Sequence, residues 1–152
     1  MLTEGDYAVA LVNSADEQEA VYSVRMVVFV EEQRVPVEEE IDTYDLTATH
    51  FLVRHLRTTP ATIIGTARLL DKGEGTGKVG RVAICIEHRG QGAGALLMRG
   101  VEQIARERGF RELILEAQVS ALGFYAKLGY VAEGDFFYDC AILHQLMRKR
   151  LD

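Results

Sequence analysis

The sequence contains few cysteines, no long apolar run and no excess of basic residues. Its two cysteines, Cys85 and Cys140, lie in apolar, strand-like stretches, which predicts buried, reduced thiols rather than a disulfide framework. No apolar stretch approaches the ~20 residues of a membrane span. The start of the chain carries Glu4 and Asp6, whereas a secretory signal begins basic and then becomes apolar. We therefore expect a cytoplasmic protein with no membrane partner.

Basic residues are outnumbered: 17 Lys and Arg stand against 23 Asp and Glu, giving a net charge of −6. This balance argues against a nucleic-acid partner. No two of the four histidines have zinc-ligand spacing, so no metal is expected. Repeats and low-complexity segments are absent from the sequence. A chain of 152 residues can bury a core without disulfides, so we expect residues 1–152 to form one domain.

Apolar periodicity and turn residues predict alternating strands and helices. Ser14 and Glu17 have the spacing of a capping box, and the helix that follows should end near Phe29. Three antiparallel strands, two helices and two further strands follow. The expected elements are a strand over 6–12, a helix over 15–29, strands over 50–56, 62–70 and 79–86, a helix over 97–108, a strand over 112–119, a helix over 120–129 and a strand over 140–147. This order is typical of an α/β protein with a mixed sheet.

An acidic segment between the first helix and His50 contains Pro36 and shows no clear periodicity. A connection of this length is usually functional or mobile. Two interpretations remain open: its carboxylates line a site for an amine, or they belong to a solvated loop. The carboxylates in question are Glu31, Glu32, Glu38, Glu39, Glu40, Asp42 and Asp45.

The stretch from Lys78 to Arg108 combines a buried strand, a glycine-rich turn and a helix. The turn runs from Arg89 to Gly94. A glycine-rich turn that opens a helix exposes backbone N–H groups at the positive end of the helix dipole. The sequence therefore predicts a binding site for a phosphate or pyrophosphate here.

Two nucleotide-binding patterns match this region only in part. The segment GEGTGK is similar to a P-loop, but Lys72 and Val79 occupy positions where that motif needs glycine and Ser or Thr. The dinucleotide fingerprint is satisfied by Gly90, Gly92 and Ala95, with Glu116 as the acid for the ribose. However, polar residues separate the strand from the first glycine, and antiparallel hairpins precede it. A dinucleotide-binding protein is therefore kept only as an alternative.

A third pattern, Arg-x-x-Gly-x-Gly, is formed by Arg89, Gly92 and Gly94. A second motif follows at the next helix, made up of Gln118, Ala121, Phe124, Tyr125, Lys127, Gly129 and Tyr130. Together they resemble the two signatures of the GNAT superfamily of N-acetyltransferases, with Gln118 in place of the usual asparagine. The resemblance implies an acyl-CoA N-acyltransferase fold: a mixed central sheet of about six to seven strands, flanking helices and two splayed parallel strands.

The resemblance also implies acetyl-CoA as cosubstrate and the amine of a small molecule or of a protein lysine as acceptor. The main chain of Val82, Ala83 and Ile84 would align the pantetheine. The pyrophosphate would lie on the loop formed by Arg89, Gly90, Gln91, Gly92, Ala93 and Gly94, and further cofactor contacts would come from Gln118, Phe124 and Lys127. Tyr125 would act as general acid.

The general base is less clearly indicated: Glu116 is ranked first, ahead of His144 and His88. A homodimer is possible, because dimers are common in the superfamily. The alternative from a different class is a CoA-binding regulatory module without turnover.

Overall fold

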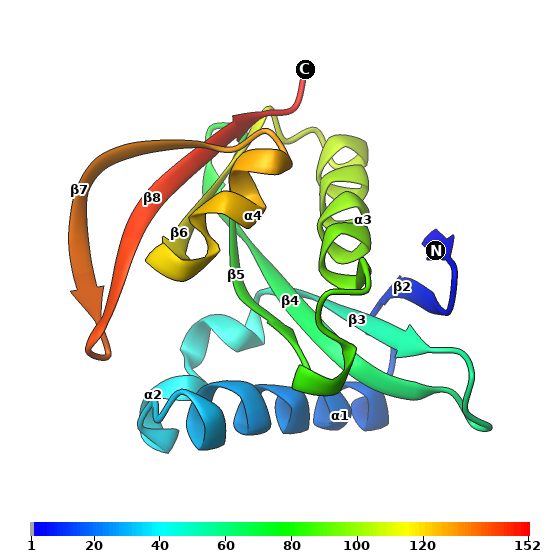
Figure 1. Cartoon of the computed structure of the whole chain (residues 1–152). Helices are drawn as coiled ribbons and strands as arrows, with labels where there is room; N and C mark the ends of the chain where they lie inside the picture. Colours follow the sequence, from blue (N-terminus) through cyan, green and yellow to red (C-terminus); the bar gives the residue numbers. More distant parts are fainter. Residues whose placement is uncertain (1) are drawn as a thin grey trace.

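The computed structural model describes residues 2–152 and contains eight strands in one sheet (Figure 1). The strands are β1 (Leu2–Glu4), β2 (Tyr7–Leu11), β3 (Thr49–His55), β4 (Thr62–Gly73), β5 (Thr76–Ile84), β6 (Glu112–Gln118), β7 (Val131–Asp139) and β8 (Ile142–Arg150). The helices are α1 (Ala15–Arg25), α2 (Val37–Glu40), α3 (Ala93–Glu107) and α4 (Leu122–Lys127), with short helical turns η1 (Met26–Glu32), η2 (Thr43–Leu46), η3 (Ile86–His88) and η4 (Val119–Ala121).

The sheet is mixed, with strand order β1-β2-β3-β4-β5-β6-β8-β7. Among the described strands only β5 and β6 pair in parallel, and every other neighbouring pair is antiparallel. This topology confirms the predicted GNAT acyltransferase fold. It also removes the dinucleotide-binding alternative, which needs a doubly wound parallel sheet.

Two helices cover opposite faces of the sheet. Leu97 and Val101 of α3 are fully buried in the main core, together with Phe51 and Leu113 of the sheet. Val24 of α1 belongs to a second, smaller cluster with Val28 and Ala83 on the other face. In Figure 1, α1 and α3 accordingly lie on different sides of the strands.

Helix α1 begins where the capping pattern predicts. The Ser14 hydroxyl accepts the N–H of Glu17 at 3.1 Å, but the Glu17 carboxylate accepts the N–H of Asn13 rather than that of Ser14. The helix then continues as the π-helix η1, in which the Gln33 N–H bonds the Val28 carbonyl at 3.2 Å. Helical structure therefore ends at Glu32, past the predicted Phe29. Such π-helical segments are frequent at functional sites.

Two strands escaped prediction. Strand β1 has three residues, too few for a periodic signal. Strand β7 is interrupted by a register shift between Glu133 and Phe137, next to Gly134, which has a φ of 78°. The sheet therefore has eight strands instead of the predicted six to seven.

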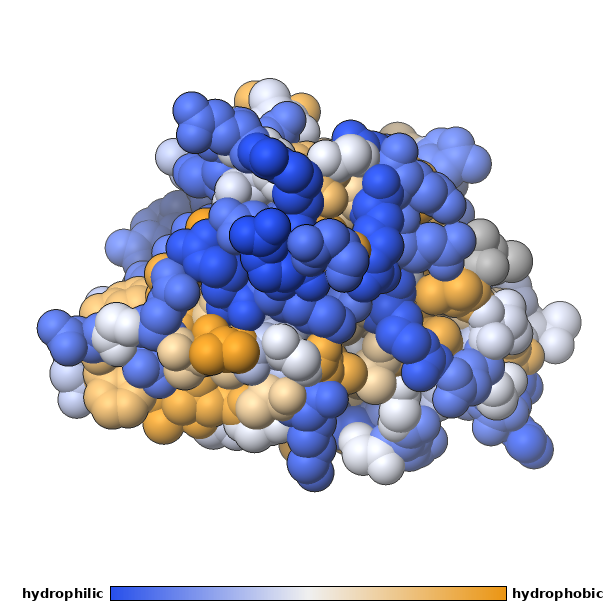
Figure 2. Space-filling model, turned by 90° about the horizontal axis from the view of Figure 1, so that it is seen from above, coloured by the Kyte–Doolittle hydropathy of each residue, from blue (hydrophilic) through white to orange (hydrophobic). Residues whose placement is uncertain are grey.

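Strand β7 is also an edge strand, with Phe136 and Tyr138 exposed. Hydrophobic residues show mainly on the left in Figure 2, the side on which the β7–β8 hairpin lies in Figure 1.

The prediction for Cys140 is wrong in its structural setting. Cys140 and Ala141 form the turn between β7 and β8, with φ values of 49° and 64°, so Cys140 is not in a strand. Both cysteines are free and only half-buried. Within residues 2–152, no helix has the length and apolar character needed to cross a membrane.

Candidate active site

A cleft opens where β5 and β6 separate. The two strands pair from Thr76 opposite Glu112 to Val79 opposite Leu115, and no pair follows although both strands continue. A bulge in β5 places Arg81 and Val82 opposite a single residue of β4. Arg81 has a φ of 54°, in the left-handed region that a non-glycine residue rarely adopts. The cleft between the separated strands has a volume of about 760 Å³.

Most residues of the predicted site line this cleft. Those that do are Val82, Ala83, Ile84, Arg89, Gly90, Gly94, Glu116, Gln118, Phe124 and Tyr125. Gln91, Gly92 and Ala93 belong to the adjoining loop and the start of α3 without lining the cleft. Lys127 lies elsewhere, in a second surface pocket with Arg106 and Lys149. The structure therefore brings the two sequence motifs together around one cleft, with Lys127 outside it.

The glycine-rich loop has the features of an anion site. Gly92 precedes α3 with a φ of 87°, and no side chain caps the first turn of that helix. A Cβ on Gly94 would lie 3.2 Å from the ring of Phe124, so glycine allows the helix start to approach this aromatic residue closely. Uncapped N–H groups at the start of a 15-residue helix favour a phosphate group.

The Arg89 side chain is engaged in bridging three segments. Its guanidinium donates to both oxygens of Glu32, at 2.6 and 2.9 Å, and its Nε donates to the Ile84 carbonyl at 2.8 Å. Hydrogen bonding to Glu32 raises the pKa of Arg89. The contact ties the loop to the end of η1 and the end of β5 and leaves the backbone of the loop available.

Tyr125 lies at the junction of the cleft and the core. Its ring packs edge-to-face against Phe124 and Tyr130, with centroid distances of 4.9 and 5.9 Å. Within the described chain its hydroxyl makes no hydrogen bond, and burial raises the pKa of Tyr125 to about 12. The side chain is therefore a neutral donor next to the cleft at physiological pH.

The polar residues of β6 contact neighbours across the cleft. Glu116 accepts a hydrogen bond from Lys78 Nζ at 2.7 Å, and Gln118 donates to Gln33 Oε1 at 2.7 Å. His144 also lines the cleft, with its ring stacked on Phe137 at 5.8 Å. Of the two histidines ranked after Glu116, only His144 reaches the cleft; His88 bonds to a tyrosine of β2 instead.

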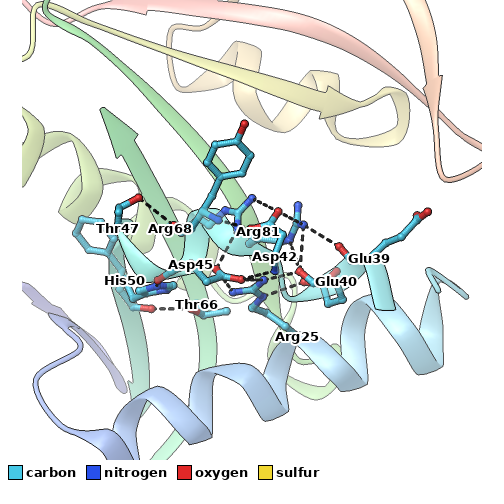
Figure 3. A network of polar contacts seen from close by, with 12 residues as sticks. Arg25, Glu39, Glu40, Asp42, Asp45, Thr47, His50, Thr66, Arg68 and Arg81 are labelled. Atoms are coloured by element: carbon cyan, nitrogen blue, oxygen red, sulfur yellow. Dashed lines mark hydrogen bonds and ion pairs between the residues drawn. The ribbon is translucent and has the colours of Figure 1, made fainter. Parts of the chain in front are cut away.

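The acidic segment forms a buried ion-pair network (Figure 3). Arg25 of α1 donates to Glu40 at 2.9 Å and to Asp45 at 2.8 and 3.0 Å, and all three side chains are buried. Arg68 of β4 donates to Asp42 at 2.7 Å and to Asp45 at 2.9 Å. Burial opposes ionisation of Asp45, but hydrogen bonds from its arginine partners hold the pKa of this carboxyl far below its usual range.

Arg81 completes the network from the bulge of β5. Its guanidinium lies 3.0 Å from the Glu40 carboxylate and 3.3 Å from that of Asp42, and it donates to the Glu40 carbonyl at 3.1 Å. Three arginines thus neutralise three carboxylates. The interpretation of these acids as an amine site is therefore wrong for Glu40, Asp42 and Asp45.

Of the other acids, Glu39 lines the cleft and has no arginine partner for its carboxylate within residues 2–152; it accepts the thiol of Cys140 at 2.9 Å. The three arginines of the ion-pair network come from α1, β4 and β5, and no local pattern in the sequence marks them as partners of these acids.

Comparison with known proteins agrees with this geometry. The family model for the acetyltransferase (GNAT) domain matches residues 14–151. An uncharacterized N-acetyltransferase of Bacillus subtilis, YjcF, is 37% identical over 143 residues, covering 93% of this chain and 98% of the relative.

Solved structures show the same architecture. A crystal structure of an acyl-CoA N-acyltransferase from Pseudomonas aeruginosa is 30% identical, with a TM-score of 0.79, and covers 95% of this chain and 98% of its own. A crystal structure from Lactobacillus plantarum has a TM-score of 0.87 at 25% identity, and the match covers 97% of this chain and 99% of that structure's chain.

The fold and cleft thus define an acyl-CoA-dependent acyltransferase, and the chain belongs to the GNAT acetyltransferase family. It is an N-acetyltransferase that uses an acyl-CoA donor.

Proposed function

We propose that this enzyme transfers an acetyl group from acetyl-CoA directly to a primary amine, in a ternary complex and without a covalent enzyme intermediate. The observation that carries the proposal is the continuity of one cleft from the glycine-rich loop, past the separated strands, to Tyr125. The acceptor is an amine of a small molecule or of a lysine side chain.

The loop and the edge of β5 account for donor binding. The uncapped N–H groups at the start of α3 suit the pyrophosphate, and glycine at position 94 leaves room for the ring of Phe124 beside the helix start. Beyond Val79, the edge of β5 that faces β6 is unpaired, so the backbone of Val82, Ala83 and Ile84 can pair with the pantetheine. An N–H in this segment would stabilise the oxyanion of the thioester, an effect typically worth about 10²–10³ in rate.

Tyr125 is proposed as the acid. The amine nitrogen forms a bond to the carbonyl carbon, the C–S bond breaks, and the electron pair stays on sulfur, which then takes up a proton. A pKa of about 12 keeps Tyr125 protonated at neutral pH. The pKa of an ordinary thiol, ~8.5, is lower than that of Tyr125, so proton transfer from the tyrosine to the thiolate is unfavourable at first. The hydroxyl therefore begins by stabilising the thiolate through a donated hydrogen bond. Burial raises the pKa of Cys85, which argues against transfer through an acetyl-cysteine.

Glu116 is proposed as the base that takes the proton from the acceptor amine. It lies in the cleft on the strand opposite the oxyanion segment, and Lys78 holds its carboxylate. Glu116→Gln should lower the rate most at low pH, where the amine is largely protonated. A rate ratio between wild type and variant that does not change with pH would exclude this role.

The acid role is tested with Tyr125→Phe, which keeps the ring and removes the hydroxyl. We expect kcat to fall about 100-fold with little change in the KM for acetyl-CoA. Tyr138→Phe, at a residue of β7 that is 74% exposed, is the matched control. A loss in kcat of less than about threefold at several pH values would exclude the acid role.

The reaction itself is tested by thiol release from acetyl-CoA with a panel of amines. Binding of CoA without any thiol release would favour the regulatory-module alternative. Absence of thermal stabilisation by millimolar CoA would contradict the proposed function altogether.

A further inference from the structure

A single tyrosine of β2 connects the glycine-rich loop to the sheet. Tyr7 is 4% exposed, and its hydroxyl donates to Gln91 Oε1 at 2.8 Å. The hydroxyl oxygen of Tyr7 also lies 2.9 Å from Nδ1 of His88. Because the one hydroxyl proton is directed at Gln91, Nδ1 of His88 carries the proton and donates to Tyr7. His88 and Gln91 lie 81 and 84 positions after Tyr7 in the chain, on either side of Arg89 and Gly90.

The tyrosine is part of a platform for the loop. Tyr7 lies opposite His55 in the β2–β3 ladder. The His88 ring contacts both, with centroid distances of 5.7 Å to Tyr7 and 4.6 Å to His55. The turn η3 therefore rests on a cross-strand pair, and the segment that follows it begins from a defined position.

Neither Tyr7 nor His55 lines the cleft, and the buried side chain of Tyr7 has little surface with which to contact a bound donor. The other side-chain anchor of the loop, the Arg89–Glu32 pair, is about one-third exposed on each partner. This pair is bidentate but partly exposed, so salt screens it. The buried hydroxyl of Tyr7 is an attachment of the loop that salt does not screen.

We propose that Tyr7 is a positioning residue that holds the glycine-rich loop in its anion-binding conformation before acyl-CoA arrives. The inference rests on the proposed function. A loop containing Gly90, Gly92 and Gly94 loses much conformational freedom when it is ordered. A loop that is already ordered loses less on binding, so the effect falls on donor affinity and not on the chemical step.

The test compares two donors in the Tyr7→Phe variant, which keeps the ring packing and removes the hydroxyl. With acetyl-CoA, we expect KM and the dissociation constant to rise about threefold to tenfold, with kcat maintained, as for loss of one hydrogen bond. With S-acetyl-pantetheine, which lacks the pyrophosphate, kcat/KM should equal that of wild type. Tyr22→Phe is the matched control, because this half-buried tyrosine makes no hydroxyl hydrogen bond within residues 2–152.

A double-mutant cycle keeps the test independent of folding effects. Gln91→Ala removes the acceptor from the exposed side of the contact. If Tyr7 acts through the loop, the two substitutions together should raise KM for acetyl-CoA by much less than the product of their separate effects.

An equal loss with both donors, or unchanged acetyl-CoA affinity in Tyr7→Phe, would overturn the inference while leaving the proposed function intact. Failure of the proposed function is recognised separately, in the wild-type protein, as an absence of acetyl-CoA binding or of thiol release.

Discussion

Two irregular segments flank the cleft, and they are held in opposite ways. Residues 37–46 are anchored by Arg25 and Arg68, whose side chains are buried, and by the partly exposed Arg81. Residues 85–92 are anchored by the neutral hydroxyl of Tyr7 and by one exposed ion pair. One wall of the cleft is therefore held by a network of ion pairs, whereas the wall proposed to receive the donor is held by a neutral hydroxyl and a partly exposed ion pair.

The physical consequence follows from desolvation. A buried ion pair is weak evidence of net stabilisation, but removing one arginine from this network leaves three carboxylates with two guanidinium groups, so one charge is no longer compensated. Substitutions in the network that holds the acidic segment should therefore lower the free energy of unfolding strongly. Substitutions in the contacts of the glycine-rich loop, which is held by one hydroxyl and a solvent-screened pair, should lower it only slightly.

The largest effect is expected for Arg25→Ala. The substitution removes the buried guanidinium that Glu40 and Asp45 share, so that Glu40 keeps only Arg81 and Asp45 keeps only Arg68. We expect the free energy of unfolding, measured in urea, to fall by about 3–5 kcal/mol. Arg57→Ala, at a side chain that is 72% exposed, should change it by less than about 0.5 kcal/mol. Similar losses in the two variants would mean that the network does not hold the segment.

The pH dependence of stability sharpens the same contrast. The folded-state pKa of Asp45 is lowered by its arginine partners, so this stabilisation is present above the unfolded-state pKa of ~3.9. It is lost as the pH falls below ~4 toward the folded-state value. Urea unfolding between about pH 2 and pH 6 should show stability decreasing toward low pH, with a smaller decrease in Asp45→Asn. The same slope in both proteins would contradict this assignment.

The smallest effect is expected at the Arg89–Glu32 pair. Because this pair is partly exposed, Glu32→Gln should lower the free energy of unfolding by about 0.2–1 kcal/mol, and by less in high salt. Glu38→Gln, at an exposed position of α2, provides the control. A loss as large as that of Arg25→Ala would show that the two walls do not differ as proposed.

Much of the fold could be predicted because its signals are local. The strands β2 to β6, the start of α1, and α3 were predicted by periodicity, caps and turn residues, although element ends shifted by a few positions. Strand β7 was missed because a bulge at Gly134 breaks its alternation. Cys140 was misplaced because the apolar run around it crosses a hairpin turn.

The candidate site was predicted only where a motif is contiguous. The loop 89–94 and the segment 118–130 carry patterns that can be read along the chain, and most of their members meet at the cleft. The acidic segment was harder to interpret, because its carboxylates look equally free in the sequence. Which of them are neutralised depends on Arg25, Arg68 and Arg81, which lie in three separate elements.

By itself, the sequence determined the alternation of strands and helices, the glycine-rich turn before α3 and the membership in an acetyltransferase superfamily, because these depend on residues that are close in the chain. Only the tertiary structure decided where β5 leaves β6, which acids are paired, and that Tyr7 supports a loop more than eighty residues away. The physical reason is that burial and hydrogen bonding act through space. Their strength is set by neighbours that come together only when the sheet has formed.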